Sequence, residues 1–426
     1  YWSVPDAYTM PWSRDCQLLR GKRDTLLWKP GSAPPAGAIG ITTIDDLQKI
    51  GNDPLFPLSG HYVLLQDIDA SATATWNAGA GFEPLGAKQG EGDLFTGTLD
   101  GDGYTISGFV INRPDEDYLG LVRHNLGTIK NLTLRGSVTG NNLTIGSITA
   151  WNGISGIGSI INCHAYVDVT AVGGAMESQG GIGGMTGRCS GNISYSSAHG
   201  DVYAPGCMGV GGFDGISSHV EGPWYGIEFC HSTGNVTGSL DVGGFAGACA
   251  NVRNSYATGA VTSELSESGS RGGGFAGACN GILENCYSIG LVTVDEVGTG
   301  GGFLVLDSGC TVTACYWDKQ TSGWNTSAGG TGKTTEEMKL QATFVGWDFA
   351  SVWNSTDSYP WLRSFFTSLG GFYSVNESTF AVTGIFNVHK TAHWQMADYG
   401  RFLVLTDGVS TLKYVDGIMS LMPRRL

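Results

Sequence analysis

The sequence predicts an all-β chain whose larger part is a parallel β-helix, a solenoid of stacked coils. Three observations predict this fold: a repeat of about 30 residues, short β-type runs broken by Gly or Asn, and no helical period of useful length. A Gly-Gly-apolar step recurs at spacings of 28, 32, 30 and 28 residues, at Gly183-Gly184-Met185, Gly211-Gly212-Phe213, Gly243-Gly244-Phe245, Gly273-Gly274-Phe275 and Gly301-Gly302-Phe303. One such unit cannot bury its apolar side alone, whereas stacked coils bury it against one another.

A second column of residues runs in phase with the first. It reads Asn131-Leu132, Asn162-Cys163, Phe229-Cys230, Asn254-Ser255, Asn285-Cys286 and Ala314-Cys315. Small or flat side chains suit a narrow interior, so we expect the Phe and Cys residues to point inward and stack from coil to coil. The predicted interior ladder comprises Phe213, Phe245, Phe275, Phe303, Cys163, Cys230, Cys249, Cys279, Cys286, Cys310 and Cys315.

Short helices are expected at both ends of the solenoid. An open stack would leave unpaired strand edges, which invite further pairing. Thr43-Ile44-Asp45-Asp46 and Thr334-Thr335-Glu336-Glu337 both have the pattern of a helix N-terminus with a side-chain cap. We interpret each as a helix that covers an end coil and carries no chemistry.

The repeat resembles the GLUG-motif repeat of bacterial surface proteins, which also occurs in the non-catalytic region of IgA1-specific metallopeptidases. The resemblance rests on Gly-Gly-Phe-Ala-Gly at 243–247 and Asn-Ser-Tyr-Ala-Thr-Gly at 254–259. It extends from a lead-in, ITTIDDLQKIGN, to a closing segment, GWDFASVWNSTDSYPWLR, and covers about residues 40–363. The resemblance implies a right-handed β-helix in a surface-exposed setting. It does not imply proteolysis, because the chain has no HExxH zinc motif.

Charge and hydropathy exclude several classes of partner. The formal net charge of −15 disfavours a nucleic-acid backbone or an anionic membrane surface. No apolar run reaches eighteen residues, so we expect no membrane insertion. The chain opens with Tyr1 and shows no basic–apolar leader, which leaves a trimmed start and a longer parent protein as alternatives.

No constellation in the sequence predicts catalysis, a cofactor or a metal site. The ten cysteines include no CxxC pair, so we expect buried, reduced thiols packed as small apolar groups. Residues 329–334 imitate a phosphate-binding loop, but Ser327 stands where that motif needs its first glycine. Asp100-Gly101-Asp102-Gly103 is typical of a turn. The eight histidines are scattered without a partner motif, and we expect a protein that is not an enzyme.

The longest interruption of the repeat, Gly215 to Phe229, is the predicted recognition loop. Its candidate contact residues are His219, Trp224 and Tyr225, because exposed aromatic rings can form docking or sugar-stacking patches. Trp76 and Trp151 also lie between regular segments. Packing within loops is the more common role for such residues.

The flanks differ in character from the repeat and suggest a three-part chain. Residues 1–39 form a flank with a Pro/Gly/Ala linker, 40–363 the β-helix, and 364–426 a small antiparallel β region. Within the last, residues 393–417 resemble a segment of tail tube and nozzle proteins of short-tailed phages.

Two main functions remain open on these grounds. The first is a phage virion protein of the tail region, whose solenoid projects outward for decoration or contact with the host surface. The alternative is a bacterial surface adhesin or stalk, and a polysaccharide-degrading β-helix enzyme is third. The expected partners are other virion or surface-assembly proteins, a host glycan or protein, and further copies of this chain.

Overall fold

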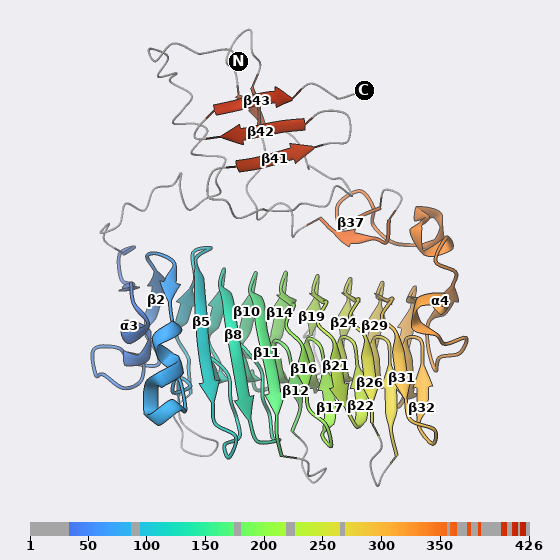
Figure 1. Ribbon diagram of the computed structural model, residues 1–426, viewed down its shortest axis with the longest axis horizontal. Coiled ribbons are helices and arrows are strands. Elements are labelled where there is room, and N and C mark those ends of the chain that lie inside the picture. The colour runs from blue at the N-terminus through green and yellow to red at the C-terminus, as the bar shows by residue number, and fades with distance from the viewer. Residues whose placement is uncertain are drawn as a thin grey trace. The chain divides into compact units, whose positions relative to one another are not determined.

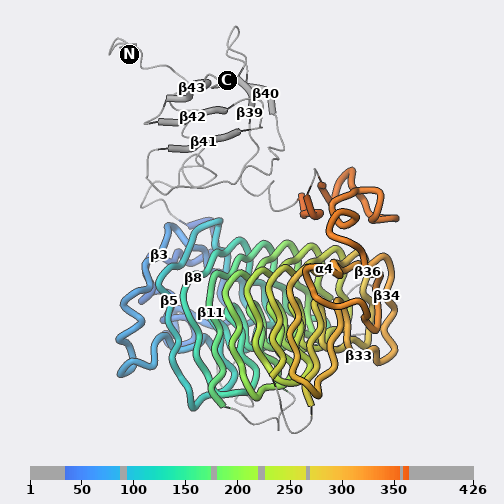
Figure 2. Tube along the Cα trace, turned by 45° about the vertical axis from the view of Figure 1, so that its right-hand side comes forward, coloured from blue at the N-terminus to red at the C-terminus, as the bar shows by residue number. Residues whose placement is uncertain are grey.

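The computed structural model describes residues 34–86, 94–173, 180–218, 226–264, 269–355 and 358–363, together with the backbone of five strands between 373 and 422. The chain divides into two compact units, residues 32–347 and the remainder. The larger unit is a parallel β-solenoid of about seven turns, so the predicted all-β solenoid is confirmed. Figure 1 shows its strands side by side, and Figure 2 shows the coils winding in succession.

Each regular coil passes through four sheets in the order A, B, D and C before the next coil begins. Sheet A has ten strands, and every pairing within it is parallel. Its strands are β1 (Ile39–Ile41), β2 (His61–Leu64), β4 (Thr98–Asp100), β7 (Thr128–Lys130), β10 (Ser159–Ile161), β14 (Asn192–Ser194), β19 (Ile227–Glu228), β24 (Val252–Arg253), β29 (Ile282–Glu284) and β34 (Thr311–Thr313).

Sheet B has fourteen strands, because most coils cross it in two short pieces. The strands are β3 (Ile68–Asp69), β5 (Thr105–Asn112), β8 (Thr133–Gly140), β11 (His164–Ala171), β15 (Ser197–Ala198), β16 (Val202–Tyr203), β20 (His231–Ser232), β21 (Val236–Gly238), β25 (Tyr256–Ala257), β26 (Val261–Ser263), β30 (Tyr287–Ser288), β31 (Val292–Val294), β35 (Tyr316–Asp318) and β36 (Thr331–Lys333).

Sheets D and C complete each coil and are joined by the Gly-Phe step of the repeat. Sheet D contains β12 (Ile182–Gly183), β17 (Met208–Gly211), β22 (Leu240–Gly243), β27 (Arg271–Gly273) and β32 (Thr299–Gly301). Sheet C contains β6 (Val122–Asn125), β9 (Thr149–Asn152), β13 (Thr186–Cys189), β18 (Asp214–Ser217), β23 (Ala246–Cys249), β28 (Ala276–Cys279) and β33 (Leu304–Asp307).

The corner between sheets A and B explains the second sequence column. One residue there adopts a left-handed conformation in coil after coil, with φ between 48° and 53°. These corner residues are Asn131, Asn162, Tyr195, Phe229, Asn254, Asn285 and Ala314. Asn tolerates this conformation better than most residues, and its amide also bonds along the stack. Asn162 Nδ2 donates to Asn131 Oδ1 at 2.9 Å, and Asn285 Nδ2 to Asn254 Oδ1 at 3.3 Å.

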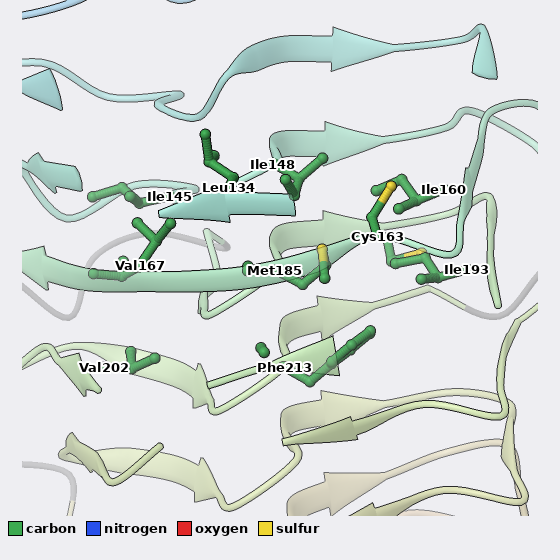
Figure 3. Packing of buried hydrophobic residues seen from close by; sticks show 14 of the residues in the cluster. Leu134, Ile145, Ile148, Ile160, Cys163, Val167, Met185, Ile193, Val202 and Phe213 are labelled. Atoms are coloured by element: carbon green, nitrogen blue, oxygen red, sulfur yellow. The ribbon is translucent and has the colours of Figure 1, made fainter. Parts of the chain in front are cut away.

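The interior is filled by aliphatic, aromatic and thiol side chains from all four sheets. Val167 and Val202 of sheet B, Ile193 of sheet A, and Met185 and Phe213 at the D–C corner are fully or almost fully buried, and Figure 3 shows them in one continuous cluster. Sheet D approaches sheet B closely because the corner carries glycine. The Ser232 and Ser288 hydroxyls, buried in sheet B, donate to the carbonyls of Gly244 and Gly302 at 2.7 and 2.9 Å.

Helices cover the ends, as expected, although one prediction needs correction. Helix α3 (Ile44–Lys49) begins after Thr43 with both hydrogen bonds of a capping box. At Thr334 the reciprocal bonds to Glu337 also form, at 3.2 and 2.8 Å, but only a 3₁₀ turn, η2 (Glu337–Lys339), follows. The chain turns extended at Leu340, with ψ at 122°, so a longer helix cannot continue.

The C-terminal end coil is covered by a different segment. Helix α4 (Lys319–Ser322) leads to Trp324, whose indole N–H donates to the Val292 carbonyl at 3.0 Å. Ser327 Oγ accepts the N–H of Leu304 at 2.8 Å. Side chains and backbone of this closing segment therefore satisfy donors and acceptors of the last coil. Two further 3₁₀ segments are η1 (Ser71–Gly79) and η3 (Gln341–Thr343).

A buried ion-pair network holds the first coils together. Arg123 is 1% exposed, and its guanidinium lies 2.6 Å from Glu83 and 3.4 Å from Glu116. Arg113 contacts the same two carboxylates at 2.5 and 2.8 Å. Loss of one partner would leave a buried charge uncompensated, so this network fixes the early coils in register.

The second unit contains three small antiparallel sheets among its described strands. Strands β37 (Trp353–Asn354) and β38 (Trp361–Leu362) form one sheet. The other two sheets are β39 (Tyr373–Val375) with β40 (Val382–Gly384), and β41 (Phe402–Thr406), β42 (Thr411–Val415) and β43 (Ile418–Met422). The predicted antiparallel character of the C-terminal flank is therefore confirmed.

Candidate functional site

The predicted recognition residues His219, Trp224 and Tyr225 lie outside the described residues. The two other tryptophans from irregular stretches do have described surroundings. Trp76 packs against the core and stacks near Phe82, with ring centroids 6.5 Å apart. Trp151 lies in sheet C beneath the Arg188 guanidinium, which is 4.8 Å from the indole centroid.

The predicted ladder residues lie where their chemistry is unavailable to a ligand. Phe213, Phe245, Phe275 and Phe303 are fully buried, and successive rings stack with centroids 4.9 Å apart. Burial also raises the pKa of the Cys163 thiol to about 12, so this group stays protonated. The remaining free cysteines of the ladder are likewise buried: Cys230, Cys249, Cys286 and Cys315.

The prediction that all ladder cysteines are reduced is wrong for one pair. Cys279 and Cys310 form a disulfide across 31 residues of sequence. Cys310 also lies off the predicted ladder, because the register partner of Cys279 is Asp307. The Asp307 carboxylate accepts the backbone N–H groups of Gly309 and Cys310 at 2.9 and 2.6 Å, which shapes a turn before β34.

The acidic and glycine-rich candidates are occupied by structural contacts. Asp100 accepts from the Asp102 N–H and from Asn131 Nδ2, and it pairs with Lys130 at 3.1 Å. The segment that imitates a phosphate loop forms strand β36, with Lys333 facing Glu337 at 3.8 Å. Among the described residues, no group of three or more His, Cys, Asp or Glu side chains is arranged to hold a metal ion.

Sequence reasoning missed a row of aromatic and histidine side chains on the outer face of sheet B. Tyr166, the first ring of the row, stacks on His199 at 4.3 Å, and the Arg135 guanidinium lies 3.9 Å from its centroid. His199 meets His231 edge-on at 5.2 Å. We call these residues, together with those that continue the row, the sheet B track: Arg135, Tyr166, His199, His231, Tyr256 and Tyr287.

The faces of most rings in the sheet B track are used within the row. His231 stacks on Tyr256 at 4.7 Å, and Tyr256 on Tyr287 at 5.0 Å, with almost parallel planes. Phe344 and Trp347 then pack against Tyr287, at 6.5 and 6.2 Å. A ring stacked on both faces presents only its edge to a ligand. His231 and Tyr287 are themselves buried, so this part of the track offers neither edges nor open faces to a ligand.

Four hydroxyl and imidazole groups, among them His199 of the track, form a connected chain of three hydrogen bonds. Ser197 Oγ lies 2.8 Å from His164 Nδ1 and 2.8 Å from His199 Nε2. His199 Nδ1 lies 2.9 Å from Thr233 Oγ1. One set of neutral tautomers satisfies all three contacts: the Thr233 hydroxyl donates to His199, His199 donates to Ser197, and Ser197 donates to His164.

The surroundings keep these imidazoles neutral. Burial lowers the pKa of His164 to about 4. Burial also lowers the pKa of His199 to about 4, with smaller contributions from His164 and Arg135. The pKa of His231 falls well below its usual value, mainly through burial and then through the other two histidines. Each added proton would place a cation beside Arg135 or another imidazole.

A serine between two histidines invites comparison with a nucleophile and its base. Ser197 is 1% exposed, so its hydroxyl cannot meet a substrate carbonyl or phosphoryl group without opening the sheet. Both histidines use their Ser-facing nitrogens in the chain described above. The arrangement stabilises the outer face of sheet B and is not a formed active site.

Asp214 is a second buried titratable group that the sequence did not reveal. It lies on β18 with no exposed surface, between Thr186 and Ala246 in register. Burial raises the pKa of its carboxyl to about 8, although Ser217 and Arg188 oppose that rise. A protonated carboxylic acid can donate a hydrogen bond, but Asp214 has no exposed surface and offers none to a ligand in solution.

A signal for the sheet B track was present in the sequence. In each coil the A–B corner residue is followed by a buried residue and then by an outward one, as in Asn162, Cys163 and His164. The outward residues of successive coils are neighbours in sheet B. Reading the first residue of each sheet B strand gives the column Thr133, His164, Ser197, His231, Tyr256 and Tyr287, of which the last three belong to the track. Tyr166 and His199 stand two residues after His164 and Ser197, in the next outward column. The interpretation of the histidines as scattered was wrong, because residues 33 or 34 apart in sequence are adjacent in the stack.

Comparisons with known proteins find two relatives and one solved structure. Halomucin of Haloquadratum walsbyi is 33% identical over an aligned length of 352 residues, and the match covers 78% of this chain and 3% of halomucin. A protein of Evansella cellulosilytica described as a Gly-rich membrane protein is 31% identical over 417 residues, 82% of this chain and 47% of that protein. The chain thus spans less than half the length of either relative.

No protein-family model matches the chain, so the GLUG-motif assignment gains no support from that comparison. A crystal structure from Bacteroides ovatus, described as an immunoglobulin A1 protease, has a TM-score of 0.48 and 22% identity. The likeness covers 77% of this chain and 92% of the other. It lies below the level at which it bears on function. No helix among the described residues is long and apolar enough to cross a membrane.

The buried imidazoles predict a stability that depends on pH. The folded pKa of His199 is about 4 and that of an unfolded histidine about 6.5, so the unfolded state binds more protons between these values. Stability from this group is complete above about pH 6.5 and is lost as pH falls toward 4. His199→Gln should reduce the slope of unfolding free energy against pH in that window by up to ~1.4 kcal/mol per pH unit. Urea titrations at each pH measure it, with Thr262→Gln on the same sheet as control. An unchanged slope in His199→Gln would contradict the assignment.

Asp214 predicts the opposite dependence. Its folded pKa of about 8 exceeds that of an unfolded aspartate, so the folded state holds a proton that the unfolded state has released. This contribution is complete below about pH 4 and declines as pH rises to 8. Asp214→Asn keeps the shape but cannot ionise, so it should be more stable than the wild type at pH 8 by at least about 2 kcal/mol and similar to it at pH 4. If the variant were less stable at pH 8, an ionised Asp214 paired with Arg188 would have to replace this account.

Proposed function

We propose that this chain is a non-enzymatic β-solenoid segment of a cell-surface protein, where it serves as a stalk and a recognition surface. The observation that carries the proposal is the use of polar groups along the stack. Polar side chains bond one coil away, as the Asn162 amide does to the Asn131 side chain and as the Asp201 carboxylate does when it accepts the backbone N–H of Asn235. Side chains committed in this way build a rigid rod, and they are not free to converge on a substrate.

The relatives favour a surface setting over a virion. One of them is described as a membrane protein, and it aligns with most of this chain. The Cys279–Cys310 disulfide adds independent support, because such bonds persist in oxidising surroundings outside the cytoplasm. A particle assembled in the reducing cytoplasm would instead favour free thiols.

The phage virion interpretation becomes the second candidate. Its sequence support lies in residues 393–417, where the described backbone comprises the two strands β41 and β42. Neither relative reported above is described as a phage protein. A polysaccharide-degrading enzyme ranks third, because its clustered carboxylates would have to arise from acidic residues such as Asp100, which is already bonded to Asn131 and Lys130.

The proposed partners follow from the same surface. Other surface-assembly proteins, further copies of this chain, and a glycan or protein of a neighbouring cell remain the candidates. Arg135 and Tyr166 are the exposed members of the sheet B track, and their guanidinium and hydroxyl groups suit a polar ligand. We expect neither nucleic acid nor inserted membrane among the partners, and no cofactor.

Localisation in the source cells tests the proposal. We expect brief treatment of intact cells with a protease to release fragments of the solenoid, and a membrane-impermeant amine label to reach its lysines. A cytoplasmic enzyme of the same cells should remain intact and unlabelled, which controls for lysis. Recovery of the chain only in the cytoplasm, or co-purification with phage particles on a density gradient, would contradict a surface role. The second outcome would move the virion function ahead.

A further inference from the structure

Cysteines flank the last strand of sheet A at both ends. Strand β34 ends the ten-strand order, and it pairs on one side with β29. Its Thr311 and Thr313 are exposed, so it presents an open edge. Cys310 directly precedes β34, and Cys315 follows it after one corner residue. Around β29, Cys286 holds the matching place at the exit, whereas Cys279 is the last residue of β28 and lies three positions before β29.

One of these two cysteine pairs is a disulfide. Cys279 is bonded to Cys310 across the corner where the chain passes from sheet C to sheet A. The bond joins the last coil to the one before it at the entry to β34. The exit from β34 has the same combination of a cysteine in each coil, Cys286 and Cys315.

The backbone brings Cys286 and Cys315 into register. The residues that follow them, Tyr287 and Tyr316, are direct partners in sheet B. The Tyr316 N–H donates to the Cys286 carbonyl at 3.0 Å, and the Asn285 N–H donates to Thr313 at 3.1 Å. In-register residues of adjacent parallel strands have Cα atoms about 4.8 Å apart, which lies inside the range that a disulfide spans.

Both side chains point into the same interior space. Cys286 is fully buried and Cys315 is 2% exposed. Burial raises the pKa of the Cys286 thiol well above its usual value, and contact with the Cys315 thiol raises it further. Each thiol donates to the carbonyl two residues earlier, at 3.3 Å for both Cys286 and Cys315.

The neighbouring coils show that this adjacency is specific. Cys163 and Cys230 occupy the same column, but a serine stands next to each. Ser196 Oγ accepts the Cys163 N–H at 3.1 Å, and Ser255 Oγ accepts the Cys230 N–H at 3.2 Å. In the described part of this column, Cys286 and Cys315 are the two cysteines that occupy consecutive coils.

We propose that Cys286 and Cys315 form a second disulfide between the last two coils, so that β34 is clamped at both ends. The oxidant is a small-molecule disulfide: the two thiols and RSSR give the Cys286–Cys315 bond and two RSH. Two S–H bonds and one S–S bond break, and one S–S bond and two S–H bonds form. The step requires one thiol to rotate away from its carbonyl acceptor toward the other sulfur, which costs only a weak hydrogen bond.

The two disulfides would stabilise the terminal strand β34. An exposed terminal strand with free backbone groups is a template for pairing with another chain. Fixing β34 at its entry and its exit keeps it on β29 and limits fraying of the last coil. The inference concerns the chain's own covalent structure and stands whether or not the surface role proposed above is correct.

Disulfide mapping of the full chain tests the inference. The protein is unfolded, reduced, and refolded with reduced and oxidised glutathione, then alkylated in denaturant and digested without reduction. Mass spectrometry should find Cys279 linked to Cys310 and Cys286 linked to Cys315, with Cys163 and Cys230 alkylated. Alkylation of both Cys286 and Cys315 in chains that carry the Cys279–Cys310 link would overturn the proposal. A Cys249–Cys279 link in place of the first bond would also overturn it, because β34 would then be unclamped at its entry.

Two variants separate the bond from a general effect of mutation. Serine already occupies this column position in two other coils, at Ser196 and Ser255, so we expect the Cys315→Ser variant to fold. In this variant Cys286 should become fully alkylated, and amide hydrogen exchange in β34 should rise several-fold. Cys163→Ser should change neither readout. Equal exchange in β34 for the oxidised wild type and Cys315→Ser would show that the second bond does not clamp the strand.

Discussion

The solenoid depends on how closely each coil approaches the next at its glycine positions. A Cβ atom at Gly200, Gly234, Gly259 or Gly290 would lie 1.8–2.0 Å from a carbonyl oxygen of the preceding coil. No side chain fits there, so only glycine lets the backbones stay at the spacing of a parallel sheet. Once that spacing is set, every in-register side chain meets its own counterpart, and the ladders follow from it.

The close spacing of the coils also determines which polar side chains are available for chemistry. Stacked polar groups satisfy one another along the axis: amides at the A–B corner, hydroxyls against glycine carbonyls, and imidazoles beside Ser197. Burial then keeps His199 neutral and holds a proton on Asp214. In a protein built in this way, the stacked polar groups are consumed by contacts between coils.

A contact could be predicted from the sequence where it recurs with the 30-residue period. It could not be predicted where an irregular turn or a contact between coils departs from that period. The Phe column was predictable because Phe213, Phe245 and Phe275 recur at 32 and 30 residues in identical surroundings. Cys310 was misplaced because the turn around Asp307 shifts it out of the ladder, toward a bond with Cys279. The histidines went unrecognised because no local motif joins residues that meet only across coils. The helix expected at Thr334 was cut to a single turn by the extended backbone at Leu340.

One substitution tests the central constraint directly. Gly259→Ala adds a methyl group that would lie 1.8 Å from the Gly234 carbonyl oxygen, whereas Gly346→Ala has no atom within 4 Å and faces only the cost of a positive φ. Urea denaturation followed by circular dichroism should show Gly259→Ala destabilised by more than about 2 kcal/mol. Gly346→Ala should lose about 1 kcal/mol or less. Equal stability of Gly259→Ala and the wild type would contradict coils packed at this distance. It would also contradict the explanation of the side-chain ladders, which depends on that spacing.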